Sequence, residues 1–184
     1  IKGFVALVAK HSSHEHPWYQ PARANPDSKY RDYYIWRDQP PTGHHQQKQV
    51  VWTQDEQDLT PWTYDEAAEA YYLHHFYDFE PDLNLCNPEV EAEIHKVMEF
   101  WLQLGVSGFR IDAAPYLGAQ DASPDEAGKA AHPILRRMRD IAASQQGDTV
   151  LIGEVDAPLN ELAPYFGDGH ELHMLFNFYL NNHL

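Results

Sequence analysis

The 184-residue sequence predicts an α/β fold in which the strands of a parallel sheet alternate with helices. Short continuous apolar runs at residues 3–9 and 149–154 are typical of strands buried on both faces. Segments 88–104 and 134–142 carry apolar residues at helical spacing. A polar, aromatic-rich stretch at 12–86 interrupts the alternation, so we expect an insertion after the first strand.

The insertion lacks any long apolar period and is rich in Pro, Tyr, Trp, Asp, Gln and His. Its polar tract at residues 44–49 is best interpreted as an exposed loop. Short strands are expected at 50–52 and 70–76, so the insertion should contain a small sheet of its own.

The helix after the insertion has clear start and stop signals. Asn87 is a favoured N-cap, Pro88 suits the first helical position, and Glu89 complements the positive end of the helix dipole. Gly105 is a natural stop. The residues predicted to face the core are Val90, Ile94, Val97, Met98, Trp101 and Leu102.

The strand that follows, at residues 106–112, alternates apolar and polar side chains. Because alternate strand residues point the same way, Arg110 and Asp112 should share one face. Pro115 and Gly118 then end the strand. An aspartate at the carboxyl end of a buried parallel strand lies where such folds keep their reactive groups.

Further along, a helix-start signature at residues 123–126 is followed by Gly128 and Pro133, which we expect to break the helix. An amphipathic helix then runs from Ile134 to near Gly147. Three arginines on it are expected to form a solvated face: Arg136, Arg137 and Arg139.

The next buried strand, at residues 149–154, again ends in a carboxylate, that of Glu154. A short helix at 160–166, a turn at 167–169 and a strand or helix start at 173–178 complete the chain.

This order implies a parallel sheet with right-handed crossovers. Since a closed (β/α)8 barrel takes about 250 residues, we interpret the chain as a partial TIM barrel. Its expected parts are a barrel strand at 1–11, an inserted irregular domain at 12–86, and barrel β/α units at 87–184. The chain begins and ends inside expected elements, which is typical of a fragment.

Composition excludes several classes of partner. The formal charge of −15 argues against nucleic acid, which normally needs a basic surface. No apolar run is long enough to span a bilayer, so no membrane association is expected. The single cysteine, Cys86, fits a reducing, cytoplasmic compartment. The oligomeric state stays open.

Two acids end consecutive strands of the predicted sheet. Asp112 and Glu154 should therefore rise close together on one rim. Retaining glycosidases need a nucleophile and a general acid/base about 5–5.5 Å apart. A cation such as Arg110 favours the ionised nucleophile. The pair therefore indicates glycoside chemistry, whereas the simpler alternative is that Glu154 only caps the following loop.

A rival metal site would use His11, His14 and His16, because histidines and carboxylates suit zinc. Their spacing fits neither one strand face nor a helical pair, so we expect no metal and no cofactor.

The motifs together resemble the α-amylase superfamily of retaining glycoside hydrolases and transglycosylases. Residues 108–116 are similar to its nucleophile motif, and 151–155 to its acid/base strand. Residues 81–84 resemble the motif that ends its domain B in the α-glucosidase and oligo-1,6-glucosidase branch. The segments at 16–36 and 71–74 resemble that branch and the related trehalose synthases.

The resemblance implies a role for each matching residue. Asp112 would be the nucleophile that forms a covalent glucosyl–enzyme, and Glu154 the general acid/base. Arg110 would orient Asp112, and His11 would bind the reacting glucose. The implied substrate is a disaccharide or short oligosaccharide with α-glucosidic bonds. The small Ala113 resembles members that prefer α-1,4 linkages.

Other features depart from the family pattern. Ala6 and Lys10 stand where its first motif usually has aspartate and asparagine, and Lys10 is a poor calcium ligand. The third family acid has no counterpart in this chain, so the isolated 184 residues are expected to be inactive.

Residues 155–158 differ from those of trehalose synthases and favour a hydrolase. Two alternatives stay open: a trehalose synthase, which isomerises maltose by intramolecular transfer, and a non-catalytic relative for sugar binding or protein association.

Overall fold

The computed structural model describes residues 2–39, 60–118, 124–144 and 148–178. Its centre is a parallel sheet of four strands in the order β1-β5-β6-β7. These strands are β1 (Phe4–Leu7), β5 (Gly108–Ile111), β6 (Val150–Gly153) and β7 (Met174–Leu175). All three pairings are parallel, which confirms the expected β/α arrangement. For residues 173–178 the sequence left open a strand or a helix start, and the structure has the strand β7 there.

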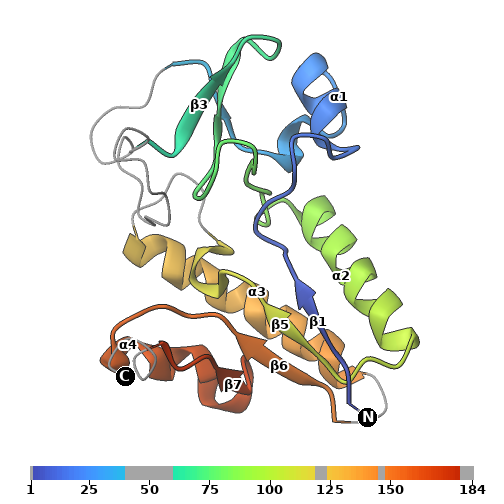
Figure 1. Ribbon diagram of the computed structural model, residues 1–184, viewed down its shortest axis with the longest axis vertical. Helices are drawn as coiled ribbons and strands as arrows, with labels where there is room; N and C mark the ends of the chain where they lie inside the picture. Colours follow the sequence, from blue (N-terminus) through green and yellow to red (C-terminus); the bar gives the residue numbers. More distant parts are fainter. Residues whose placement is uncertain (1, 40–59, 119–123, 145–147, 179–184) are drawn as a thin grey trace.

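The helices between the strands complete the β/α units. α2 (Pro88–Gln103) precedes β5, and α3 (Pro124–Ser144) precedes β6 (Figure 1). α4 (Leu159–Leu162) and the 3-10 helix η4 (Ala163–Gly169) come before β7. A further 3-10 turn, η3 (Ala114–Tyr116), follows β5 directly. One apolar core joins strands and helices, and its fully buried members include Met98, Phe109, Ile111, Leu135, Met138 and Leu151.

α2 begins and ends as its sequence predicts. The Asn87 side chain accepts a hydrogen bond from the Glu89 N–H at 2.9 Å. Gly105 has a φ of +87°, the left-handed conformation that glycine adopts most readily. Val97 was wrongly placed on the core face: it is 39% exposed, because the buried stripe runs through other positions, namely Val90, Ile94, Met98 and Leu102.

α3 corrects two predictions. It continues through Gly128 and Pro133 as one helix. Its buried residues Ile134 and Leu135 hold it against the core, and this packing outweighs the unfavourable propensity of proline. A Cβ on Gly118 would lie 2.4 Å from the Ala130 backbone, so η3 and α3 approach closely just before the proline.

Arg136 and Arg137 of α3 have exposed side chains, as expected of a solvated face, but the three arginines also bind other parts of the chain. Arg136 donates to the fully buried Glu171 carboxylate at 2.9 Å, and Arg139 donates to the Glu171 carbonyl at 3.1 Å. Arg137 pairs with Glu91 on α2. The sequence did not show these partners, because they come from distant parts of the chain.

The insertion contains its own antiparallel sheet, in the order β2-β4-β3. Its strands are β2 (Trp36–Arg37), β3 (Trp62–Asp65) and β4 (Ala70–Leu73), accompanied by α1 (Tyr19–Ala24) and the 3-10 turn η1 (Arg31–Tyr33). The strand expected at 50–52 and the loop expected at 44–49 lie outside the described residues. The division of the chain at residues 11 and 86 stays a proposal.

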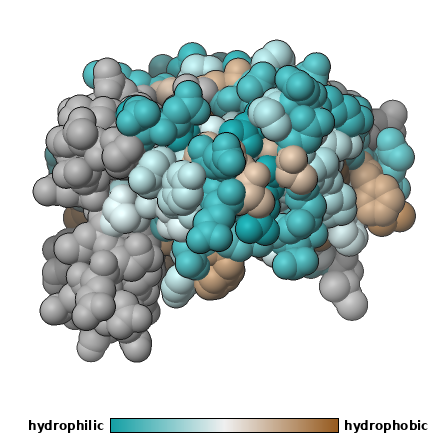
Figure 2. Space-filling view, turned by 90° about the horizontal axis from the view of Figure 1, so that it is seen from above, coloured by the Kyte–Doolittle hydropathy of each residue, from teal (hydrophilic) through white to brown (hydrophobic). Residues whose placement is uncertain are grey.

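Figure 1 shows the insertion beyond the carboxyl ends of the barrel strands. Two isolated bridges hold its returning end: Asp82 pairs with His11, which follows β1, and Leu83 pairs with Tyr34 inside the insertion. Viewed from above in Figure 2, the described part of this surface is largely hydrophilic, with small apolar patches. The insertion thereby forms one wall over the strand ends.

Candidate active site

The ends of β5 and β6 bring two carboxylates together. Ile111 pairs with Gly153 in the parallel register, so Asp112 and Glu154 leave the sheet at the same height. The backbone continues the ladder there, with the Glu154 N–H donating to the Ile111 carbonyl at 2.9 Å. Because neighbouring strands lie about 4.8 Å apart, the two side chains can face one small group.

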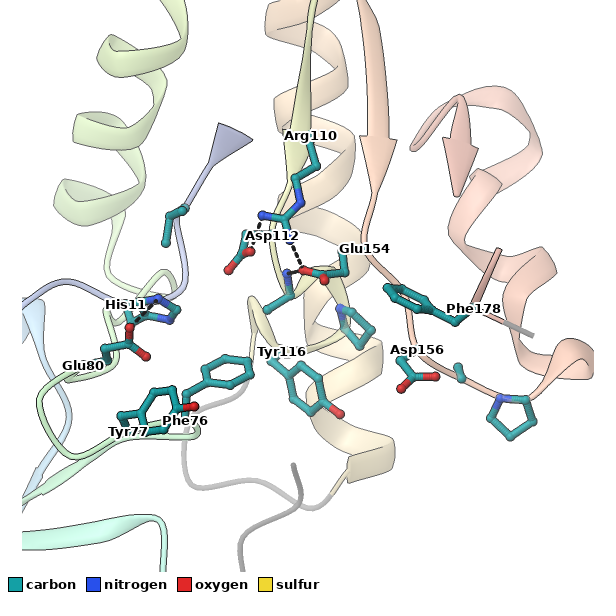
Figure 3. Close-up of a pocket in the computed structure, with 15 residues that line it drawn as sticks. His11, Phe76, Tyr77, Glu80, Arg110, Asp112, Tyr116, Glu154, Asp156 and Phe178 are labelled. Atoms are coloured by element: carbon teal, nitrogen blue, oxygen red, sulfur yellow. Dashed lines mark hydrogen bonds and ion pairs between the residues drawn. The ribbon is translucent and has the colours of Figure 1, made fainter. Parts of the chain in front are cut away.

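Arg110 binds both carboxylates at once (Figure 3). Its Nη1 donates to Asp112 Oδ1, and its Nη2 donates to Glu154 Oε2 at 2.6 Å. The guanidinium is planar, and its two nitrogens are held in a fixed geometry. Both acids are therefore held within the reach of one guanidinium group.

Each of the two carboxylates has one oxygen that is available to a bound molecule. Glu154 Oε2 also accepts from the Ala113 N–H at 3.3 Å, so Oε2 has two donors. In the described part of the chain, no hydrogen bond is made by Asp112 Oδ2 or Glu154 Oε1. These two oxygens can act on a bound molecule while their partners hold the carboxylates in place.

Ala113, directly after Asp112, has a left-handed backbone with φ +46° and ψ +43°. This conformation is uncommon for a residue other than glycine. It turns the chain so that the Ala114 N–H reaches the Glu154 carbonyl at 3.1 Å. A strained residue beside the two acids is typical of a functional site.

The carboxylates open into a cavity of about 770 Å³ between the strand ends and the insertion (Figure 3). This volume lies in the range of pockets for small molecules. The cavity is lined by residues from both parts of the chain: Val8, His11, Phe76, Tyr77, Glu80, Arg110, Asp112, Ala113, Pro115, Tyr116, Glu154, Asp156, Ala157, Pro158 and Phe178. All four residues singled out from the sequence, Arg110, Asp112, Glu154 and His11, meet there.

His11 lies on the wall nearest the insertion. Its Nε2 is 4.0 Å from Glu80 Oε1, and its ring meets the Phe76 ring edge-on, with centroids 5.4 Å apart. The His11 Nδ1 is buried and has no hydrogen-bond partner among the described residues. The structure therefore places His11 in the cavity wall, across from the guanidinium.

Lys10, one of the departures from the family pattern, is fully buried in a cluster of charged groups. Its Nζ donates to Asp82 Oδ2 at 2.6 Å, and the same oxygen binds His75 Nδ1. Although burial alone would raise it, the charges of Lys10 and His75 lower the pKa of Asp82 to about 2. Burial lowers the pKa of Lys10, with Asp82 opposing that effect.

Ala6, the other departure, pairs with Arg110 in the β1–β5 register and is exposed.

The histidines of the rival zinc site have other partners. His14 Nε2 lies 3.1 Å from the Tyr72 hydroxyl, and His16 Nδ1 accepts from the Trp18 N–H at 3.1 Å. Within the described ranges, no three His, Cys, Asp or Glu residues are grouped so that they could hold a metal ion.

Several cavity residues carried no signal in the sequence. Phe76, Tyr77 and Glu80 come from the end of the insertion, about thirty positions before Asp112. Asp156 and Phe178 follow β6 and β7. These residues follow neither a helix nor a strand period in the sequence. The sequence therefore does not show which of them face the cavity, and the folded insertion does.

No helix in the part of the chain that the structure describes is long and apolar enough to cross a membrane.

Comparison with known proteins identifies relatives for the whole chain. The family model "Alpha amylase, catalytic domain" matches residues 1–183. The trehalose synthase of Thermus thermophilus is 41% identical over 179 residues, which are 97% of this chain and 18% of that protein. The oligo-1,6-glucosidase of Halalkalibacterium halodurans is 34% identical over 196 residues, covering 97% of this chain and 34% of that protein.

Solved structures agree. The trehalulose synthase MutB superposes with a TM-score of 0.82 and 31% identity, covering all of this chain and 35% of that one. The trehalose-6-phosphate hydrolase of Bacillus licheniformis gives 0.80 and 27%, covering 97% and 33%. This chain thus spans about a third or less of the proteins it matches. Its partial barrel, its motifs and this match over residues 1–183 show that the chain belongs to the α-amylase catalytic-domain family.

Proposed function

We propose that the protein carrying this chain is a retaining glycoside hydrolase that cleaves α-glucosidic bonds, chiefly α-1,4, in short gluco-oligosaccharides. The observation that carries the proposal is the pair of carboxylates held by one guanidinium at neighbouring strand ends. The expected strand spacing of about 4.8 Å is close to the separation of about 5–5.5 Å that a retaining mechanism needs.

In the first step, Asp112 Oδ2 attacks the anomeric carbon of the glucose and the bond to the glycosidic oxygen breaks. Glu154 gives its proton to that oxygen from Oε1, and the shortened sugar leaves. Arg110 holds the other oxygen of each acid, so neither carboxylate has to reorient during the step. His11, in the cavity wall, binds the hydroxyls of the reacting glucose.

In the second step, Glu154 removes a proton from water, and the water oxygen attacks the same anomeric carbon. The ester to Asp112 breaks, releasing glucose with its original anomeric configuration. The step needs no cofactor, and the single Cys86 fits a reducing, cytoplasmic setting.

A second candidate is a trehalose synthase, which would use the same two acids. The 41% identity to the Thermus thermophilus enzyme favours it, and that relative also covers 97% of this chain. It differs only in the acceptor: the released glucose, retained in the cavity, attacks in place of water. Incubation of the full-length protein with maltose separates the two, because hydrolysis gives glucose and isomerisation gives trehalose.

The nucleophile assignment is tested by Asp112→Asn in the full-length protein, assayed with an aryl α-glucoside. An amide cannot form the glycosyl ester, so turnover should fall by several orders of magnitude. Asp140→Asn, the same change at an exposed position on α3, serves as the matched control. An unchanged rate in the Asp112→Asn variant would refute the assignment, and a folded wild type with no turnover would favour the non-catalytic alternative.

A further inference from the structure

Two carboxylates in the cavity wall take no part in the proposed chemistry. Glu80 comes from the end of the insertion, and Asp156 comes from the loop that follows β6. Figure 3 shows them on opposite sides of the cavity, with Asp112 and Glu154 between them. The cavity is therefore bordered by more negative charge than the two reacting acids supply.

This negative charge is only partly balanced. Among the described residues that line the cavity, four carry carboxylates, whereas the cationic groups are the Arg110 guanidinium and, when it is protonated, the His11 ring. The guanidinium already binds Asp112 and Glu154. The described wall thus keeps a net negative charge whether His11 is protonated or neutral.

The two additional acids are available to interact with a ligand. Glu80 Oε1 lies 4.0 Å from His11 Nε2, which is too far for a hydrogen bond, and the Glu80 side chain is 27% exposed. Asp156 is exposed and makes no hydrogen bond or ion pair with the residues that the structure describes. Both charges therefore act on any molecule that enters the cavity.

The effect of Asp156 is visible at Tyr116, which also lines the cavity. Burial raises the pKa of the Tyr116 hydroxyl, and the charge of Asp156 raises this pKa further. The ionised phenol is disfavoured because like charges repel strongly where little water separates them. A ligand that brings a negative charge to the same wall meets the same repulsion.

The size of the cavity does not by itself exclude a charged sugar. Its volume of about 770 Å³ lies within the range of pockets that hold drug-sized ligands, so a sugar that carries a phosphate group would fit. A phosphate monoester carries a charge of about −1.5 to −2 near neutral pH, whereas an unmodified glucoside carries none. Discrimination between the two would therefore come from the charges on the wall.

We propose that Glu80 and Asp156 are specificity-determining residues that exclude phosphorylated sugars from the cavity and favour neutral glucosides. This inference rests on the proposed function, because it takes the reacting glucose to lie at Asp112 and Glu154. Repulsion acts during approach as well as in the bound state, so kcat/KM is the quantity that should respond.

The test compares three aryl α-glucosides in the full-length protein. They are 4-nitrophenyl α-D-glucoside, its 6-phosphate, and its cationic 6-amino-6-deoxy analogue. The double variant Glu80→Gln/Asp156→Asn keeps the shape of both side chains and removes both charges. In this variant, kcat/KM for the phosphate relative to the neutral glucoside should rise about 10²-fold, roughly one power of ten for each charge removed.

The cationic substrate and the ionic strength separate repulsion from a change in cavity shape. In the double variant, kcat/KM for the amine relative to the neutral glucoside should fall about tenfold, because an attraction is lost. In the wild type, the disadvantage of the phosphate should shrink as ionic strength rises from about 0.01 M to about 1 M, since salt screens the wall charges.

Asp140→Asn is the matched control, because Asp140 is an exposed acid on α3 that is not among the residues lining the cavity. This variant should leave both ratios as they are in the wild type. An unchanged phosphate ratio in the double variant would overturn the proposal. So would a shift of the phosphate and amine ratios in the same direction, or an equal shift in the Asp140→Asn variant.

A binding measurement separates this inference from the proposed function, because it needs no turnover. By calorimetry, the wild type should bind glucose 6-phosphate at least about tenfold more weakly than glucose, and the double variant should lose most of this difference. That result in a protein without glucosidase activity would refute the proposed function and leave the charge selection standing. Equal binding of the two sugars by an active wild type would overturn the charge selection alone.

Discussion

Arg110 is the residue on which the geometry of the site depends. Its side chain is 31% exposed, and its guanidinium binds two carboxylates at the ends of two strands. Neither acid is held by a second charged group among the described residues. The planar fork of Nη1 and Nη2 can serve two acceptors at once, whereas a lysine ammonium acts as a point charge on a flexible stem.

Arg110→Lys should therefore keep the positive charge but lose the simultaneous hydrogen bonds to Asp112 and Glu154. We expect kcat for an aryl α-glucoside to fall about 10²-fold, the size typical of misplacing reacting groups, with a smaller change in KM. Single-turnover and steady-state assays of the full-length protein measure the two effects. The melting temperature should change little, because the side chain is partly exposed. A loss confined to KM would contradict a role in positioning both acids.

At this scale, much of the site is predictable. Arg110 and Asp112 share a face because strand residues alternate, and Glu154 joins them because parallel strands end at one rim. The partners of Lys10 and His11 are not predictable in this way. Asp82 and Glu80 lie about seventy residues away, and the path of the insertion alone decides that they meet.

The contacts between elements show how the insertion is attached to the barrel. Lys10 follows β1, while His75 and Asp82 belong to the returning end of the insertion. All three side chains are buried, and Tyr116 from η3 packs on the His75 ring with centroids 5.9 Å apart. The neighbours of Lys10 and His75 on the chain, His11 and Phe76, both line the cavity. This ionic cluster therefore supports that wall.

Lys10→Met should remove the buried cation and leave His75 as the remaining ion-pair partner of Asp82 among the described residues. At pH 8 we expect a loss of about 3 kcal/mol in the free energy of unfolding, as is typical when a buried pair is broken. Urea unfolding of the full-length protein, followed by a signal from this domain, measures it.

The pH dependence of that loss follows from His75. Burial first, and then the Lys10 charge, lower the pKa of His75, while Asp82 opposes them. In the wild type, His75 is therefore protonated at a higher pH in the unfolded chain than in the folded protein. The free energy of unfolding decreases as pH falls through about 6.5, the pKa of histidine in an unfolded chain. Without Lys10 the folded pKa rises and His75⁺ pairs with Asp82, so the gap between variant and wild type should narrow towards pH 5.

Lys96→Met is the control for this measurement, because Lys96 is 66% exposed and its ion pair in the described part of the chain is with Glu93 on its own helix. Its effect should be small and independent of pH. A Lys10→Met deficit that is the same at pH 8 and pH 5 would contradict the transfer of charge to His75.

α3 shows that the propensities of a single element do not predict its contacts with other elements. The helix-breaking tendencies of Gly128 and Pro133 are real, but the core on one side of α3 keeps it continuous. The arginines look like a solvated face in the sequence, and the buried Glu171 that they bind arrives from the loop before β7. Helix ends, by contrast, depend on local groups, which is why Asn87 and Gly105 were predictable.

At the scale of the whole molecule, the described sheet is open at both edges. β1 and β7 each pair with one strand only, and apolar residues near these edges are exposed: Phe4, Val8, Met174 and Phe176 are 43–55% exposed. The sequence predicted this incomplete barrel by counting strands and helices against about 250 residues for a closed one. Which apolar side chains would be left open could be known only from the strand register.

The open edges predict how residues 1–184 behave when expressed alone. Exposed edge strands pair readily with other chains, and exposed apolar patches promote association. We expect the isolated segment to bind the dye ANS and to form concentration-dependent oligomers in sedimentation, while the full-length protein does neither. We also expect no turnover of an aryl α-glucoside by the segment, because the third family acid has no counterpart in it.

Substitutions at the sheet edges test whether the exposed edge residues cause the association. Phe4→Lys and Met174→Lys place charges where the exposed apolar side chains lie, so together they should reduce oligomer formation of the segment without restoring activity. Val97→Lys and Phe100→Lys, which change exposed apolar residues of α2 and none of the edge strands, provide the comparison. If the α2 changes prevent association as well as the edge changes do, the open sheet is not its source; if the unmodified segment is monomeric and active, four strands already suffice for the chemistry.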